Sequence, residues 1–222
     1  MNTEVRYVKF DPLTKSGEIL MPGLIQCYRT VFGDEPWNEW KKCLVCGSKW
    51  GLLEVDKLKS LNCKHCGETL VDFWPSSVVR NSIYEEITSE ASCWLAVVSD
   101  AEVVGFCWGY PVAPAELEKK LKLPGVKDGI ESNFGKIDLV AYQDEIGVIK
   151  EYRNKNIAKA MFKKRLEDFL GAGVSVGIVR TMSSPPSAAF SWYEKLGYKV
   201  ISEYNDEDRR VILARSLKDL DI

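Results

Sequence analysis

The spacing of hydrophobic positions changes along the chain, most clearly between residues 142 and 172. An apolar extended run ends at Ile149, a polar turn follows, and apolar residues then recur at intervals of three and four. The recurring positions are Ile157, Met161, Phe162, Leu166, Phe169 and Leu170. This change predicts a buried strand, a tight turn and a helix that Gly171 and Gly173 terminate.

Similar patterns predict the other elements of the chain. Strands are expected at residues 4–10, 94–98, 103–110, 136–150, 174–181, 199–204 and 209–216, with a turn at 205–208 joining the last two. Helices are expected at residues 20–32, 76–87 and 115–123, with Ser76 or Ser77 as the N-cap of the second. The insertion at 111–134 is predicted to combine the charged third helix with a Gly-rich loop around Pro124, Gly125 and Gly129, a possible lid over an acceptor site.

The cysteines contain the most specific chemical signal. Cys43 and Cys46 form one Cys-x-x-Cys knuckle, Cys63 and Cys66 form a second, and sixteen residues separate them. Four thiolates at this spacing predict a tetrahedral zinc site, and the segment 41–72 resembles a zinc ribbon. A closed shell of four cysteines leaves no position for water or substrate, so the zinc is expected to be structural. Disulfides are the alternative reading.

The only histidine, His65, lies between two of these cysteines. Its position argues against acyl transfer through a Ser-His-Asp triad or another catalytic histidine. The remaining cysteines, Cys27, Cys93 and Cys107, are predicted to be ordinary buried residues.

Composition and charge restrict the possible partners. The chain has 222 residues, 30 of them basic and 32 acidic, which gives a formal charge of -2. No overall field therefore attracts nucleic acid or an anionic membrane, and the surplus of lysines in the ribbon is small. The first residues lack a secretory pattern, and no apolar run approaches the roughly 18 residues that span a bilayer. We expect a soluble, cytoplasmic protein, with nucleic-acid binding as the less favoured alternative.

Residues 148–158, VIKEYRNKNIA, resemble the coenzyme A turn of the GNAT N-acetyltransferase superfamily. Arg153 and Ala158 match the pattern of that turn, while Asn154 and Asn156 stand where glycine is frequent. Asparagine tolerates a positive φ better than other residues except glycine, so the turn can still form. A second segment, residues 189–198, is similar to the late helix and following strand of the family, and the resemblance extends over roughly residues 76–216.

The resemblance implies a mixed α/β (α+β) fold, with a mostly antiparallel central sheet flanked by helices. The GNAT-like domain would span residues 1–222, with the four-cysteine zinc ribbon at 41–72 inserted within it. The segment after the first helix lines the acceptor site in many relatives, so Glu35, Trp37 and Trp40 are candidates to face the substrate. Packing of both tryptophans on the ribbon is the alternative.

The resemblance also implies an N-acetyltransferase in which an amine directly attacks the thioester of acetyl-CoA. Val148 would contact the pantetheine arm, and the pyrophosphate would lie on the turn formed by Arg153, Asn154, Lys155, Asn156, Ile157, Ala158 and Lys159. Tyr193 would protonate the departing thiolate, unless it is only a core residue. Glu145, with Asp144 as second candidate, would take the proton of the amine, unless these carboxylates are merely solvated or paired.

Acetyl-CoA and a primary amine of unassigned identity are the expected partners. The alternative is an inactive GNAT scaffold in which the ribbon binds another protein or a nucleic acid, a hypothesis that rests on Asn154 and Asn156 in the cofactor turn.

Overall fold

The computed structural model describes residues 4–99, 101–183, 187–203 and 210–218. The chain divides into two compact units. The first unit comprises Met1–Thr88, Cys93–Cys107 and Ile146–Met161, and the second comprises Ser89–Ser92, Trp108–Glu145 and Phe162–Ile222.

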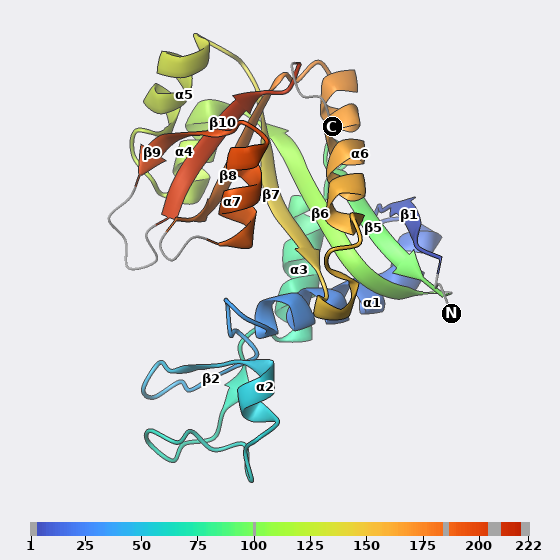
Figure 1. Ribbon diagram of the computed structural model, residues 1–222, viewed down its shortest axis with the longest axis vertical. Coiled ribbons are helices and arrows are strands. Elements are labelled where there is room, and N and C mark those ends of the chain that lie inside the picture. Colours follow the sequence, from blue (N-terminus) through green and yellow to red (C-terminus); the bar gives the residue numbers. More distant parts are fainter. Residues whose placement is uncertain (1–3, 100, 184–186, 204–209, 219–222) are drawn as a thin grey trace. The chain divides into compact units, whose positions relative to one another are not determined.

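The main sheet has seven strands in the order β1-β5-β6-β7-β8-β10-β9 (Figure 1). The strands are β1 (Arg6–Lys9), β5 (Ser92–Val98), β6 (Glu102–Val112), β7 (Val140–Val148), β8 (Val176–Met182), β9 (Lys199–Glu203) and β10 (Arg210–Ser216). β1 runs antiparallel to β5, and β10 runs antiparallel to both β8 and β9, whereas β7 and β8 are parallel. The predicted mixed α/β fold with a mostly antiparallel sheet is therefore confirmed.

Helices accompany this sheet, and a small second sheet lies in the cysteine-rich segment. The helices are α1 (Lys15–Gly33), α2 (Leu52–Val55), α3 (Ser76–Glu86), α4 (Pro114–Leu121), α5 (Val126–Phe134), the single 3₁₀ turn η1 (Lys150–Tyr152), α6 (Ile157–Gly171) and α7 (Ala188–Lys195). The small sheet has the order β3-β2-β4, formed by β2 (Lys41–Lys42), β3 (Lys49–Trp50) and β4 (Val71–Asp72). The turn predicted at 205–208 lies outside the described residues.

In the first unit, two helices begin differently from the sequence-based expectation. α1 starts at Lys15, five residues before the predicted start, because Thr14 caps it by accepting a hydrogen bond from the backbone N–H of Gly17 at 3.0 Å. α3 has Pro75 as its N-cap, so neither Ser76 nor Ser77 has the predicted capping role. The first turn of α6 contributes to an apolar core with strand residues such as Val104 and Val148.

In the second unit, the region predicted as a Gly-rich loop contains the additional helix α5. Gly125 adopts a φ of 88° before the helix, and the Glu118 carboxylate accepts hydrogen bonds from the backbone N–H groups of Gly125 and Lys127 at 3.0 and 2.9 Å. Gly129 lies inside α5 and close to β9. A Cβ at this position would be 3.0 Å from the carbonyl oxygen of Ile201, which explains why the residue is glycine. Glycine here therefore reflects close packing on β9 rather than a loop.

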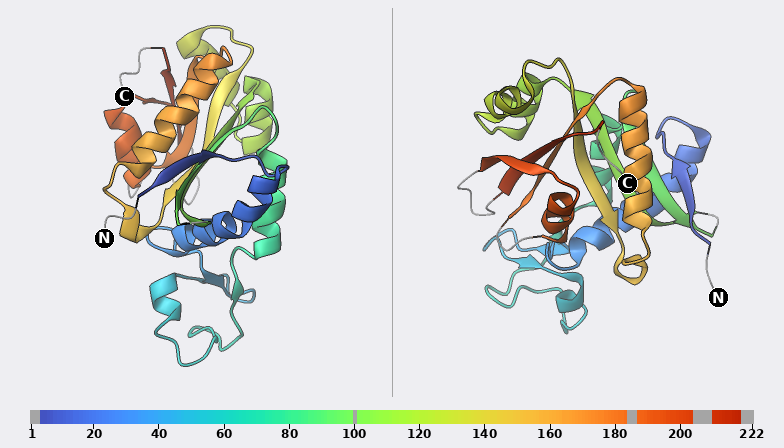
Figure 2. Two further views of the ribbon diagram at one scale, coloured as in Figure 1. Left: turned by 90° about the vertical axis from the view of Figure 1, so that its right-hand side faces the viewer. Right: turned by 45° about the horizontal axis from the view of Figure 1, so that its top comes forward.

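The core of the second unit joins α4 and α5, the yellow-green helical pair in Figure 2, to the strands. Its fully buried members include Leu117 of α4, Ile130 of α5 and Val140 of β7. Each strand predicted for this unit has a counterpart, but the strand predicted at 136–150 is shorter, because β7 spans only Val140–Val148 and the 3₁₀ turn η1 follows it.

Replacing Glu118 with alanine should destabilise the second unit by about 1 kcal/mol, because the two backbone donors at the start of α5 lose their acceptor. Glu116→Ala is the matched control, because Glu116 is exposed and its ion pair with Lys119 is long, at 4.0 Å. Urea unfolding of both variants measures the difference. Equal stability of the two would contradict this capping role.

Candidate active site and metal centre

The turn predicted to bind coenzyme A connects β7 to α6 through η1. Asn154 and Asn156 both adopt left-handed backbone conformations, with φ values of 61° and 60°. Asparagine is the residue other than glycine that enters this region most readily, so the two departures from the family pattern preserve the path of the chain. Ile157 then begins α6, and its side chain is buried.

Arg153 holds this turn through contacts with the residues that flank it. Its Nε donates a hydrogen bond to the carbonyl oxygen of Val148 at 3.0 Å. Its Nη2 lies 3.2 Å from Oδ2 of Asp34, the buried C-cap residue of α1, in an ion pair whose geometry does not form a hydrogen bond. The guanidinium therefore contacts the end of β7 and the C-cap of α1.

The first turn of α6 is the candidate site for negatively charged oxygen atoms. The N–H groups at a helix start lack intrahelical acceptors and lie at the positive end of the helix dipole. Ala158 is half-buried and Lys159 is exposed, while the ammonium group of Lys155 lies 4.7 Å from the ring centroid of Tyr152. The turn and the start of α6 therefore offer backbone N–H groups and lysine side chains to an anion. Val148, the residue predicted to contact the pantetheine arm, ends the preceding strand and is 8% exposed.

In the second unit, a buried arginine joins two strands and a helix. Arg165 of α6 is fully buried, and its Nη1 donates to the carbonyl oxygens of Trp108 at 2.8 Å and Glu145 at 2.9 Å. Its Nη2 donates to Oε1 of Gln143 at 3.0 Å and lies 3.4 Å from the hydroxyl of Tyr193. The sequence reasoning missed Arg165, although a basic residue four positions after Met161 on the apolar face of a helix was a signal for it.

Tyr193 is buried, as both of its sequence-based interpretations allow. Its ring packs against Phe162, Trp192 and Tyr198 at centroid distances of 5.9, 5.2 and 5.0 Å. Nε2 of Gln143 donates to the hydroxyl of Tyr198 at 2.6 Å, and burial raises the pKa of Tyr198 far above its usual value. The Tyr193 hydroxyl thus lies within a polar network enclosed by aromatic rings.

The two candidate carboxylates lie side by side on β7, and both are partly buried. Asp144 accepts a hydrogen bond from Tyr110 at 2.9 Å and forms an ion pair with Lys120 at 3.2 Å. Burial, followed by the negative charges of Asp144 and Glu145, raises the pKa of Tyr142 well above its usual value, so that hydroxyl remains protonated at neutral pH.

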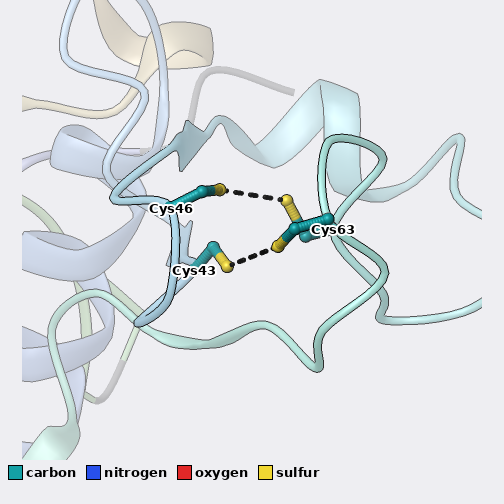
Figure 3. Close-up of side chains that lie close together, drawn as sticks. Cys43, Cys46 and Cys63 are labelled. Atoms are coloured by element: carbon teal, nitrogen blue, oxygen red, sulfur yellow. Dashed lines mark hydrogen bonds between the residues drawn. The ribbon is translucent and has the colours of Figure 1, made fainter.

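In the first unit, the four predicted metal ligands converge. Figure 3 shows Cys43 and Cys46 on one loop facing Cys63 on the other. The sulfur atoms of Cys43 and Cys66 are 3.4 Å apart, those of Cys46 and Cys63 are 3.6 Å apart, and all four lie within 4.8 Å of one another. Sulfur atoms about 2.3 Å from a zinc ion at tetrahedral corners would be about 3.8 Å apart, so the cluster is compatible with a zinc ribbon.

Within the cluster the pKa of Cys63 is lowered while that of Cys66 is raised to about 12, and His65 is not one of the clustered residues. A hydrogen bond with the Ser48 side chain lowers the pKa of Cys63 to about 6. His65 instead packs its ring against Trp50 at a centroid distance of 5.6 Å. The remaining cysteines, Cys27, Cys93 and Cys107, are buried, as the sequence predicts.

Of the two tryptophans near the ribbon, Trp40 follows the packing alternative, whereas Trp37 packs on α1 and not on the ribbon core. Trp40 packs against the ribbon core, which includes Cys43 and Trp50, and also lies against Gly33 of α1. Trp37 packs on Phe32 at 5.8 Å, while Glu35 is exposed.

Among the helices of the described residues, none combines the length and the apolar character that a membrane-spanning helix requires.

Comparison with known proteins identifies the family. The sequence profile of the Acetyltransferase (GNAT) family matches residues 62–198, more than half of the chain. The chain therefore belongs to the GNAT acetyltransferase family. A comparison with curated protein sequences gave no significant match.

Solved structures support the same fold. A putative acetyltransferase of the GNAT family from Desulfovibrio desulfuricans matches with a TM-score of 0.54 and 10% identity, over 96% of this chain and 99% of that one. The PaiA N-acetyltransferase from Thermoplasma acidophilum, solved in complex with coenzyme A, matches with a TM-score of 0.54 and 14% identity over 96% and 99%. NAA60 of Arabidopsis thaliana, in complex with acetyl-CoA, matches with a TM-score of 0.54 and 15% identity over 97% and 99%.

The positive φ of Asn156 makes a specific prediction about substitution. Asn156→Gly should be more stable than Asn156→Ala by about 1 kcal/mol, because alanine is strained in the left-handed region and glycine is not. Among the described residues of this turn only Asn154 and Asn156 have positive φ, so at Lys155 the order should reverse. Urea unfolding of the four variants tests both statements, and the same order at both positions would contradict them.

Proposed function

We propose that this protein is an acetyl-CoA-dependent N-acetyltransferase that moves the acetyl group to a primary amine. The observation that carries the proposal is the turn between β7 and α6. It combines two left-handed asparagines with the open start of a long helix in a chain of the GNAT family. The turn keeps its left-handed conformation although asparagines replace the usual glycines. This favours an active protein over an inactive scaffold.

The proposed cofactor contacts all lie in the first unit. The backbone from Asn154 to Lys159 would receive the pyrophosphate, with Lys155 and Lys159 adding positive charge. Arg153 would act through the turn, because its guanidinium already contacts Val148 and Asp34. Val148 would contact the pantetheine arm. The cofactor would supply a thioester carbonyl, whose carbon accepts the amine.

In the proposed transfer, the lone pair of the neutral amine forms a C–N bond to the thioester carbonyl carbon. The C–S bond then breaks, and the sulfur atom leaves with its electron pair. Glu145 is the proposed acceptor of the amine proton, and Asp144 is the second candidate. Tyr193 is the proposed donor to the thiolate, and the Arg165 guanidinium places a positive charge beside its hydroxyl.

The four cysteines are proposed to bind one zinc ion, which would stabilise the ribbon. A segment of about thirty residues has too small an apolar core to fold unaided, and metal binding then supplies folding free energy. No open coordination position remains among four thiolates, so the ion would have no part in acetyl transfer.

The alternative function is an inactive scaffold whose ribbon binds another macromolecule. The exposed apolar residues Leu44 and Val45 at the tip of one knuckle favour it, at 71% and 70% exposure. The left-handed asparagines weaken it, because the substitutions that suggested an impaired turn preserve the turn conformation.

Acetyl-CoA should bind the zinc-loaded protein, and Ala158→Glu should weaken that binding at least tenfold. A carboxylate in the first turn of α6 stabilises the helix through its dipole, but repels the pyrophosphate. Ala172→Glu is the matched control, because it adds the same charge at an exposed position just beyond the other end of α6. Isothermal titration calorimetry with acetyl-CoA measures all three proteins.

Two outcomes would count against the proposal. Absence of acetyl-CoA binding by the parent protein would favour the scaffold alternative. Equal weakening by Ala158→Glu and Ala172→Glu would mean that the cofactor does not bind at the start of α6.

Purified protein should contain one equivalent of zinc, and Cys66→Ser should lose most of it, because one of four ligands is removed. Cys27→Ser, a change of a buried thiol in α1, should retain the metal. Metal analysis by mass spectrometry measures both, and melting curves with a chelator should show that the parent loses stability. A metal-free parent protein of full stability would contradict the zinc assignment.

A further inference from the structure

A cluster in the second unit surrounds an ammonium group with a carboxylate and two aromatic rings. Nζ of Lys120, in α4, lies 3.2 Å from Oδ2 of Asp144 and also donates a hydrogen bond to the hydroxyl of Tyr110. The same nitrogen is 4.5 Å from the ring centroid of Tyr110 and 5.9 Å from that of Tyr142. One carboxylate and two π faces are the groups that recognise a primary ammonium ion.

The receptor half of this cluster is fixed by the strands. Tyr110 belongs to β6, while Tyr142 and Asp144 belong to β7, and the two rings contact each other edge to face at 5.8 Å. Tyr110 donates a hydrogen bond to the Asp144 carboxylate at 2.9 Å. Tyr142 is 3% exposed and belongs to the core of this unit, so the position of its ring is set by packing.

The cationic half reaches the cluster on a flexible stem from outside the sheet. Lys120 lies in the helical insertion between β6 and β7, and its side chain is 40% exposed, against 14% for Asp144. Four rotatable methylene groups connect its ammonium to α4, so the ammonium can leave while the carboxylate and the rings stay. The arrangement is that of a rigid receptor holding a tethered ligand.

We propose that Tyr110, Tyr142 and Asp144 form a subsite for an alkylammonium group of the acceptor, and that Lys120 occupies this subsite until the acceptor displaces it. The acceptor class would then be amines that carry a slender, positively charged alkylammonium group, which fits between two rings and a carboxylate. Its assignment to an acceptor rests on the proposed acetyltransferase function, whereas the ammonium subsite itself does not.

The consequence for substrate affinity is competition within the chain. A ligand can bind such a site only when the tethered group has left it. Its apparent affinity is therefore the intrinsic affinity multiplied by the fraction of molecules in which the site is open. Removing the Lys120 ammonium should therefore increase affinity for a soluble alkylammonium ion. A lysine that served only as a structural ion-pair partner would give no such gain.

The test uses n-butylammonium chloride, which reproduces the four-carbon stem and ammonium of lysine. Lys120→Ala should bind it at least tenfold more tightly than the full-length parent, as measured by calorimetry and by the rise in melting temperature. Lys119→Ala is the matched control, because Lys119 is the neighbouring lysine of α4 with a side chain that is 81% exposed. It should bind like the parent.

Two further measurements establish where and why n-butylammonium binds. The double variant Lys120→Ala, Asp144→Asn should lose the gained affinity, because the carboxylate charge is gone. Neutral 1-butanol should give no comparable stabilisation of Lys120→Ala. Equal binding of n-butylammonium by Lys120→Ala and Lys119→Ala, or undiminished binding by the double variant, would overturn the proposal.

Folding and function are controlled separately. If Lys120→Ala fails to fold, as judged by near-ultraviolet circular dichroism of the tyrosines, Lys120→Gln replaces it with a polar, uncharged side chain that is one bond shorter than lysine. Acetyl-CoA binding is measured in the same variants. Failure of the acetyltransferase function would appear there, while the ammonium subsite is judged by n-butylammonium alone.

Discussion

The buried guanidinium of Arg165 is the interaction on which the second unit depends. It donates hydrogen bonds to carbonyl oxygens of β6 and β7 and to Gln143, and it lies beside the hydroxyl of Tyr193. Burying a charge costs free energy that its hydrogen bonds must offset, so removing the partners of such a group is strongly destabilising. The same charge thus joins α6 to two strands and places the proposed proton donor next to a cation.

In the first unit, a second arginine holds the turn that we propose binds the cofactor. Arg153 contacts the end of β7 through Val148 and the end of α1 through Asp34, so an arginine that the family pattern associates with the cofactor serves first to hold the turn. The two left-handed asparagines then carry the backbone into α6. In the proposed function, the backbone N–H groups of this turn contact the cofactor. The direction of these groups depends on φ more than on the identity of the side chain, so asparagine in place of glycine is compatible with an intact turn.

The ribbon and the helical insertion show two ways of adding to a common fold. The ribbon has only a few buried apolar residues, and its cysteine cluster provides the remaining cohesion if it binds zinc. The insertion instead buries Leu117, Val126 and Ile130 against the strands, and needs no metal. It also brings Lys120 to Asp144, so this helical pair supplies the ammonium group of the proposed acceptor subsite.

The sequence by itself determined most of the elements, the family and the four cysteines of the cluster, because hydrophobic period and short fixed spacings are local properties of a chain. It also suggested the left-handed turn, since asparagine's tolerance of positive φ is a property of the residue. Tertiary structure alone decided that Gly129 lies within a helix, that Arg165 is buried, and that Lys120 meets Asp144. These three depend on contacts between residues distant in the chain, namely the approach of Ile201, the carbonyl groups of two strands, and the fold of an insertion over β7. No local pattern encodes which partner a side chain will find across such distances, because packing of the whole unit selects it.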